Sequence, residues 1–192
     1  MWKIGILLFP GVEELDFVGP FEVLSYVNKL APASTQVLLV AEETTELRAF
    51  NGLRILPDVT LTACPDLDIL VVPGGKGRLA AMKNANLRQF IQAQANQARF
   101  ITSVCTGAFL LAEAGLLTGR QATTYHECLD ELSRYGVEVL TAKVVDAGRI
   151  ITAGGVSSGL ELGFYLLQKM FGPDMAREVA RKIEYSPEIP LD

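Results

Sequence analysis

Cys105 is the residue whose setting most clearly suits chemistry. It stands in Ser103-Val104-Cys105-Thr106-Gly107, after an apolar run typical of a strand and before a segment with helical spacing. Small residues at both second neighbours, Ser103 and Gly107, permit the tight strand-to-helix turn of a nucleophile elbow. A thiol at a helix start faces the positive end of the helix dipole, which favours thiolate over thiol. Buried structural cysteines are common, but this context favours a reactive nucleophile.

Two glycines lie at the end of another predicted strand. Gly74 and Gly75 follow the apolar run at 67–72, and glycine permits close approach of the backbone to a ligand. Their N–H groups, with those of Cys105 and Thr106, are candidates for an oxyanion-type pocket. A simple glycine turn is the alternative, and the nearby elbow favours the functional interpretation.

Asp16 is the candidate proton partner of the cysteine. It lies early in the first predicted helix, between Leu15 and Phe17, and this apolar setting suits a raised carboxyl pKa. Such a group can donate a hydrogen bond when protonated, or carry a proton. The alternative is an ordinary solvated acid at a helix start, which is how we interpret Glu13 and Glu14.

The remaining cysteines and the single histidine give weaker signals. Cys64 and Cys128 have no elbow context, and the chain contains no CxxC pair. His126 is the only histidine and is a possible general base. With one histidine and three widely spaced cysteines, we expect neither a zinc site nor a disulfide framework, and we predict no metal or organic cofactor. Reduced thiols favour a cytoplasmic protein.

Short apolar runs alternate with helical patterns along the chain. Helices are expected at about 15–29 with Pro20 near its start, 87–98, 107–114, 127–135, 158–171 and 173–184. Strands are expected at 3–9, 36–41, 67–72, 99–104, 122–125, 137–140, 144–145 and 150–152, with a hairpin over 45–56 turning at Asn51-Gly52 and an irregular tail at 186–190. This alternation predicts an α/β fold: a flavodoxin-like three-layer αβα sandwich with a mostly parallel central sheet, carried by one domain over 1–192.

The composition excludes several classes of protein. The 192 residues are 49% hydrophobic and 20% charged, with a net charge of −5, which is ordinary for a globular enzyme. No basic stripe is present, so we expect no nucleic-acid partner. The apolar run at 2–9 is too short for a signal-peptide core or for a membrane span of ~20 residues, so we expect no membrane partner either.

Taken together, these motifs resemble the ThiJ/PfpI superfamily, which has the class I glutamine amidotransferase-like fold. The resemblance covers nearly the whole chain. The matching segments are 6–12, 14–20, 68–75, 102–107, 112–117 with Gly119 and 122–124, and 151–155 with Gly159. Within the superfamily, Leu-Asp-x-x-Gly-Pro at 15–20 and Ser-Val-Cys-Thr-Gly at 103–107 look most like the isocyanide hydratase branch. The same segments also occur in the N-terminal domains of AraC-type regulators.

The resemblance implies a reaction and roles for the site residues. Cys105 would attack the terminal carbon of an isocyanide, Asp16 would protonate that carbon, and hydrolysis of the thioimidate would give an N-formamide. Thr106 and the Gly75 amide would position the thiolate and the developing charge. Superfamily members are usually homodimers that act on small molecules, and we expect the same of this chain.

Two features depart from that pattern. The hydratases typically have Thr-Thr-His-Trp where this chain has Thr123-Thr124-Tyr125-His126, so Tyr125 and His126 are expected to alter the substrate-binding pocket. The hydratases also tend to continue beyond the point that corresponds to Asp192. The protease and amidotransferase branches have histidine directly after the cysteine, and Thr106 argues against them.

Two other functions fit the same elbow. A glyoxalase-like enzyme would act on 2-oxoaldehydes, although those branches usually have glutamate at the place of Asp16. A non-catalytic redox sensor or stress protein would use a thiolate at Cys105 that oxidises readily. A substrate panel distinguishes the three hypotheses.

Overall fold

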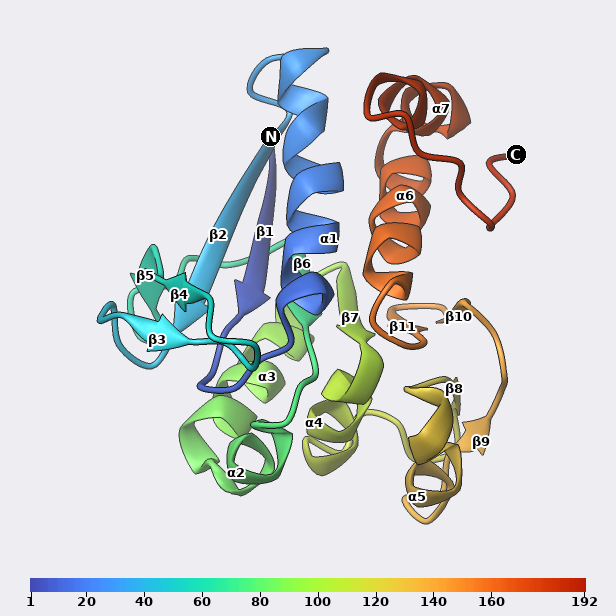
Figure 1. Cartoon of the computed structure of the whole chain (residues 1–192). Helices are drawn as coiled ribbons and strands as arrows, with labels where there is room; N and C mark the ends of the chain where they lie inside the picture. Colours follow the sequence, from blue (N-terminus) through green and yellow to red (C-terminus); the bar gives the residue numbers. More distant parts are fainter.

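A seven-stranded sheet forms the centre of the protein in the computed structural model, which describes residues 1–192 (Figure 1). The strand order is β10-β11-β7-β6-β1-β2-β5, and every pair is parallel except β10 with β11. The strands are β1 (Trp2–Leu7), β2 (Thr35–Ala41), β5 (Val59–Thr60), β6 (Ile69–Val72), β7 (Phe100–Val104), β10 (Val144–Ala147) and β11 (Ile150–Ala153). The prediction of a mostly parallel α/β sheet is confirmed. The sequence analysis missed the short edge strand β5.

Helices cover both faces of the sheet and complete the three layers. One group packs together as α1, α6 and α7, and the other as α2, α3 and α4 (Figure 1). The helices are α1 (Glu14–Tyr26), continued by η1 (Val27–Lys29), α2 (Arg78–Lys83), α3 (Ala85–Gln97), α4 (Ala108–Glu113), α6 (Ser158–Phe171) and α7 (Pro173–Lys182). The sequence analysis missed α2. No helix has the length and apolar character needed to cross a membrane.

Close packing of α1 against α6 positions the start of both helices. A Cβ atom on Gly19 would lie 3.2 Å from a backbone nitrogen of α6, and one on Gly159 would lie 3.0 Å from Cδ of Pro20. These glycines therefore let the two helices approach closely. Pro20 lies inside α1 and not near its start as predicted. Without an N–H, Pro20 cannot bond the carbonyl of Asp16 four residues earlier.

The predicted hairpin is present next to the main sheet. Its strands β3 (Leu47–Arg48) and β4 (Arg54–Ile55) are antiparallel. The turn is closed by the Ala49 N–H, which donates to the Leu53 carbonyl at 2.9 Å, and Gly52 has a φ of +101°. Glycine adopts such a positive φ at little cost, which is why Asn51-Gly52 predicts this turn correctly.

A small lobe lies outside the main sheet. It contains β8 (Gln121–Ala122) and β9 (Glu138–Val139), which pair in parallel, together with η3 (His126–Cys128) and α5 (Leu129–Ser133). The predicted strand at 122–125 is therefore much shorter. Its last residues leave the ladder because the Thr123 N–H donates to Thr152 Oγ1 and the Thr124 hydroxyl donates to the Cys105 carbonyl, both at 2.8 Å.

Candidate active site

Cys105 lies at the tight turn between β7 and the helical segment η2 (Cys105–Gly107) that leads into α4. It has a φ of +54° and is buried. Its N–H donates to the Gly154 carbonyl at 2.7 Å, and its carbonyl accepts from Thr124 Oγ1. A Cβ on Gly107 would lie 2.0 Å from the Val72 carbonyl, so only glycine fits there. The predicted elbow is confirmed, and its strained backbone is held by its neighbours.

Asp16 lies beside the Cys105 thiol and is removed from solvent. Its Oδ2 accepts from the Gly74 N–H at 2.8 Å. Its Oδ1 has no hydrogen-bond partner of normal geometry, and the Cys105 thiol is the side chain that interacts with this carboxyl group. Burial, and then the charge of nearby Glu13, raise the pKa of Asp16 to about 7, whereas the Gly74 hydrogen bond lowers it. The raised carboxyl pKa expected from the apolar sequence context is confirmed.

Thr106 connects the glycine turn to the thiol. Its Oγ1 accepts from the Gly75 N–H at 3.0 Å. The Thr106 hydroxyl and backbone N–H favour the thiolate and lower the pKa of Cys105, but by less than burial raises it. Donors aimed at a sulfur stabilise negative charge on it. The Gly75 amide thus fixes the Thr106 side chain next to Cys105.

The thiol itself differs from the expectation. Burial and the charge of Asp16 raise the pKa of Cys105 to about 12, and the prediction of a depressed thiol pKa is wrong. Burial disfavours the charged thiolate, and this effect outweighs the lowering of the thiol pKa by Thr106. Asp16 and Cys105 are best treated as one coupled site, and between pH values of about 7 and about 12 the two groups share one proton. Thiol with carboxylate, and thiolate with carboxylic acid, are the two arrangements of that proton.

The glycine turn does not supply the free oxyanion donors that the sequence suggested. The Gly74 N–H is used by Asp16, the Gly75 N–H by Thr106, and the Cys105 N–H by Gly154. Gly74 is nevertheless required, because a Cβ there would lie 2.4 Å from Thr106 Oγ1. The role of Gly74 and Gly75 is to hold the carboxyl group and the threonine in place.

The thiol opens into a cavity of about 320 Å³, within the range of small-molecule sites. Its wall is formed by Glu13, Phe50, Gly75, Lys76, Arg78, Cys105, Thr106, Tyr125 and Val156. Tyr125 therefore lies at the cysteine as predicted. His126 does not: it is exposed, borders a neighbouring cavity, and has Nε2 3.9 Å from Glu127 Oε1.

The sequence analysis missed the residues that the hairpin and α1 bring to this cavity. Glu13 and Glu14 are half-buried, and their interpretation as ordinary surface charges is wrong. Glu14 accepts from the Asn51 N–H at 2.8 Å and from the Leu53 N–H at 3.3 Å, which fixes the hairpin against the start of α1. Phe50 of the hairpin turn thereby reaches the cavity wall. Two acidic residues at a helix start do not reveal, in the sequence, that they contact a hairpin far along the chain.

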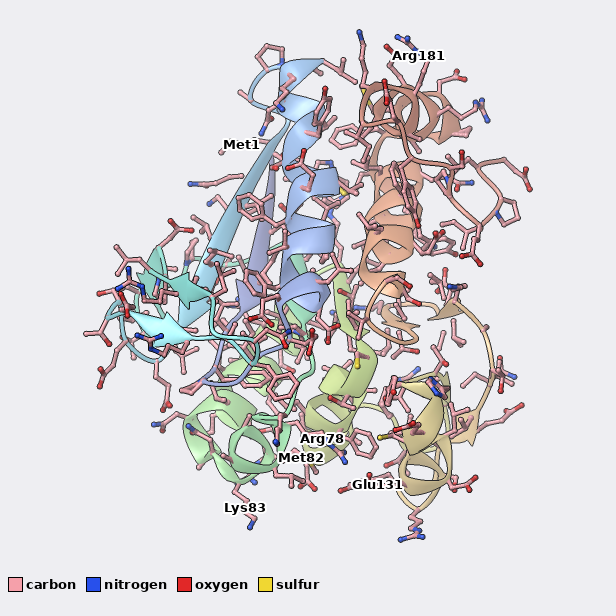
Figure 2. All side chains as sticks on the ribbon, in the orientation of Figure 1. Met1, Arg78, Met82, Lys83, Glu131 and Arg181 are labelled. Atoms are coloured by element: carbon pink, nitrogen blue, oxygen red, sulfur yellow. The ribbon has the colours of Figure 1, made fainter.

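A second clamp joins α2 to the small lobe. Arg78 donates to both carboxylate oxygens of Glu131 in α5, at 3.1 and 2.7 Å, and Figure 2 shows the two side chains between these elements. The guanidinium carbon of Arg78 also lies 4.2 Å from the centre of the Phe109 ring. Bidentate pairs of this kind fix orientation as well as distance. The clamp holds the lobe that carries Tyr125 next to the cysteine.

Comparison with known proteins agrees with this architecture. The model of the DJ-1/PfpI family matches residues 2–169. The chain belongs to the DJ-1/PfpI family. It is 39% identical over 190 residues to an isonitrile hydratase of Pseudomonas putida, which covers 99% of this chain and 81% of that protein.

A solved structure and a longer regulator also resemble this DJ-1/PfpI chain. A ThiJ/PfpI family protein from Pseudomonas syringae superposes with a TM-score of 0.90 at 34% identity, over 98% of this chain and 77% of that one. The transcriptional regulator GbdR of Pseudomonas aeruginosa is 26% identical over 187 residues, which cover 95% of this chain but 50% of the regulator. The predicted family and fold are therefore confirmed.

Proposed function

We propose that this protein hydrates isocyanides to N-formamides, with Cys105 as nucleophile and Asp16 as proton carrier. The observation that supports this most directly is the buried Asp16–Cys105 pair, which holds one proton near neutral pH. Isonitrile is another word for isocyanide, and the similarity to an isonitrile hydratase over nearly the whole chain supports the same substrate class.

The first step makes the thioimidate. The Cys105 sulfur forms a bond to the terminal carbon of R–N≡C, and Asp16 transfers its proton to that carbon, giving R–N=CH–S–Cys105 and an Asp16 carboxylate. The pair supplies both the nucleophile and the acid in its thiolate and carboxylic-acid arrangement. Thr106, next to the sulfur, would stabilise its negative charge.

The second step returns the pair to its starting state. Water attacks the imidate carbon while the Asp16 carboxylate accepts a proton from it. The carbon–sulfur bond then breaks, and the product tautomerises to R–NH–CHO. The net reaction consumes one water, and the pair again holds one proton. Removing either group therefore removes a step that the other cannot perform.

The test follows formamide formation from an aryl isocyanide by absorbance. We expect Cys105→Ala to reduce kcat/KM by at least about 10³-fold, the scale of loss for a covalent nucleophile. Cys64→Ala is the matched control, since Cys64 is a half-buried thiol outside the site. Acid quenching and intact mass should show an adduct of one isocyanide on the wild type and none on Cys105→Ala. Equal turnover by Cys105→Ala would refute the proposal.

The same panel separates the competing enzyme. A nematode relative, the glutathione-independent glyoxalase DJR-1.2 of Caenorhabditis elegans, is 24% identical over 183 residues. Methylglyoxal should be consumed slowly or not at all, because Asp16 has one methylene fewer than the glutamate expected for that branch. Faster consumption of methylglyoxal than of every isocyanide would assign the site to 2-oxoaldehydes. If neither isocyanides nor methylglyoxal are turned over and peroxide oxidises Cys105 selectively, a redox sensor would be favoured.

The assembly and location are part of the same proposal. We propose a cytoplasmic homodimer that acts on a small molecule. Exposed Val18 on α1 provides apolar surface for a second copy, and three free cysteines suit a reducing compartment. Light scattering should give twice the chain mass of 20.8 kDa. A monomer at micromolar concentration would contradict the dimer.

A further inference from the structure

A second cavity lies next to the cysteine cavity. It has a volume of about 640 Å³, and Tyr125 and Val156 border both cavities. Because these two residues are common to both walls, they stand between the two spaces. The second cavity is the larger of the two and is not used by the reaction steps described above.

The second cavity also reaches the elbow through the backbone. Thr124 and Gly154 line it, and these are the two residues that hydrogen-bond the carbonyl and the N–H of Cys105. Leu15, the neighbour of Asp16, lines it as well. A group bound there would therefore contact residues that adjoin Cys105 and Asp16, although neither of these two lines the second cavity.

Tyr125 is held in its dividing position. Its ring lies against the bare backbone of Gly155, where an added Cβ would be 3.2 Å from Tyr125 Cδ2. The ring of His126 meets it edge-on at a centroid distance of 4.4 Å. An aromatic ring with contacts on two sides is a fixed partition and not a freely rotating surface group.

We propose that the second cavity takes the R group of the substrate and that Tyr125 determines which R groups fit. This inference rests on the proposed attack of Cys105 on an isocyanide carbon. The carbon binds at the thiol in the smaller cavity, and the R group extends past Tyr125 and Val156.

The wall of the second cavity indicates the chemistry of that R group. Leu15, Leu129 and Val156 contribute apolar side chains. Lys143 also lines the cavity, but its Nζ is 3.2 Å from Glu188 Oε1, so its charge is already paired. A neutral, largely apolar R group of at least the size of a phenyl ring fits this lining best.

The first test compares a large and a small substrate. We would measure kcat/KM for 2-naphthyl isocyanide and for methyl isocyanide, and use their ratio. Ala142 is an exposed residue on the wall of the second cavity, and Ala142→Phe narrows it. The ratio should fall by at least about 10-fold, the scale of selectivity for a misfit in an apolar pocket. Ala63→Phe, at an exposed alanine that lines neither cavity, should leave the ratio within about twofold of wild type.

Removal of the partition should act in the opposite direction. Tyr125→Ala joins the two spaces, and the naphthyl-to-methyl ratio should rise, whereas Tyr125→Phe keeps the ring and should keep the ratio. A ratio that is unchanged in both Ala142→Phe and Tyr125→Ala would overturn the inference. So would a change of oligomeric state in Ala142→Phe with an unchanged ratio, since that would place the cavity in a subunit interface.

A second readout does not need isocyanide turnover. Alkylation of Cys105 by N-(2-naphthyl)iodoacetamide and by iodoacetamide, followed by peptide mass, gives a second large-to-small ratio. This ratio should also fall about 10-fold in Ala142→Phe. If wild type turns over no isocyanide but the labelling ratio falls, the proposed function is wrong and the cavity assignment holds. If isocyanides are turned over and neither ratio changes, the function holds and the cavity assignment is wrong.

Discussion

Two carboxylates are buried in this protein, Asp16 in α1 and Glu161 in α6, and their surroundings differ. Both oxygens of Glu161 accept hydrogen bonds, from the Tyr185 hydroxyl and from the N–H groups of Glu188 and Ile189. Asp16 has one conventional hydrogen bond, and its other oxygen has none. Buried polar groups normally find partners, so an incomplete set next to a thiol makes Asp16 the candidate for the proposed chemistry.

The hydrogen bonds of Glu161 suit a structural acid, whereas those of Asp16 suit the proposed reactive one. Glu161 fastens the C-terminal tail to α6, and the ring of Tyr185 stacks on Phe164 at 5.6 Å. Asp16 accepts a conventional hydrogen bond only from the Gly74 N–H, and its burial raises its pKa to about 7. The two acids should therefore respond in opposite ways when they are replaced.

The largest difference should be in turnover. Asp16→Asn keeps the shape but cannot carry a proton, so kcat/KM for an aryl isocyanide should fall by about 10²- to 10⁴-fold. Glu161→Gln should retain most of the wild-type turnover at a temperature where it is folded. Loss of activity in the Glu161 variant equal to that in the Asp16 variant would remove the distinction.

The next difference is the pH dependence of stability. The Asp16 carboxyl ionises near 3.8 when unfolded but near 7 when folded, so the folded state holds an extra proton in between. The free energy of unfolding therefore falls as pH rises through that window. Asp16→Asn avoids this loss and should be more stable than wild type at pH 8, by up to about 4 kcal/mol. At pH 4 wild type and Asp16→Asn should have nearly the same free energy of unfolding. Urea unfolding at both pH values provides the measurement, and a variant that is less stable at pH 8 would contradict the account.

Replacement of Glu161 should instead destabilise the protein. Glu161→Leu leaves the Tyr185 hydroxyl and two backbone N–H groups without their acceptor, which should cost about 3 kcal/mol of unfolding free energy. Urea unfolding at pH 7 gives the value. A stabilised Glu161→Leu would mean that the tail contacts contribute little to the fold.

The smallest effect should come from one tail contact alone. Tyr185→Phe removes a single hydroxyl donor and keeps the ring against Phe164, so it should cost about 1 kcal/mol. Thermal unfolding of this variant beside Glu161→Leu measures the share of that one bond. Equal losses in the two variants would show that the backbone contacts of Glu161 add nothing.

Local patterns were sufficient to predict the strand-to-helix elbow and the burial of Asp16. Ser103 and Gly107 mark a tight turn by their size, and the apolar neighbours of Asp16 indicate burial. The Asn51-Gly52 turn was found for the same reason, since its conformational requirement lies in two adjacent residues. These features depend on residues close in sequence.

Features that depend on distant contacts were not predictable. The destination of the Gly74 N–H depends on where α1 places Asp16, 58 positions away in the chain. The thiol pKa depends on burial and on the charge of Asp16, and both are set by residues far from Cys105 in the sequence. The ion pair between Arg78 and Glu131 joins α2 to the small lobe. The hydrophobic periodicity of the sequence did not predict α2.

The central claim is that Asp16 and Cys105 share one proton. The most direct test is the rate of alkylation of Cys105 by iodoacetamide between pH 5 and 9, read by peptide mass, in wild type and Asp16→Asn. The account predicts that the wild-type rate rises with a midpoint near pH 7, where the pair loses its first proton, and that Asp16→Asn has no midpoint there. The same midpoint in both proteins, or none in wild type, would contradict it.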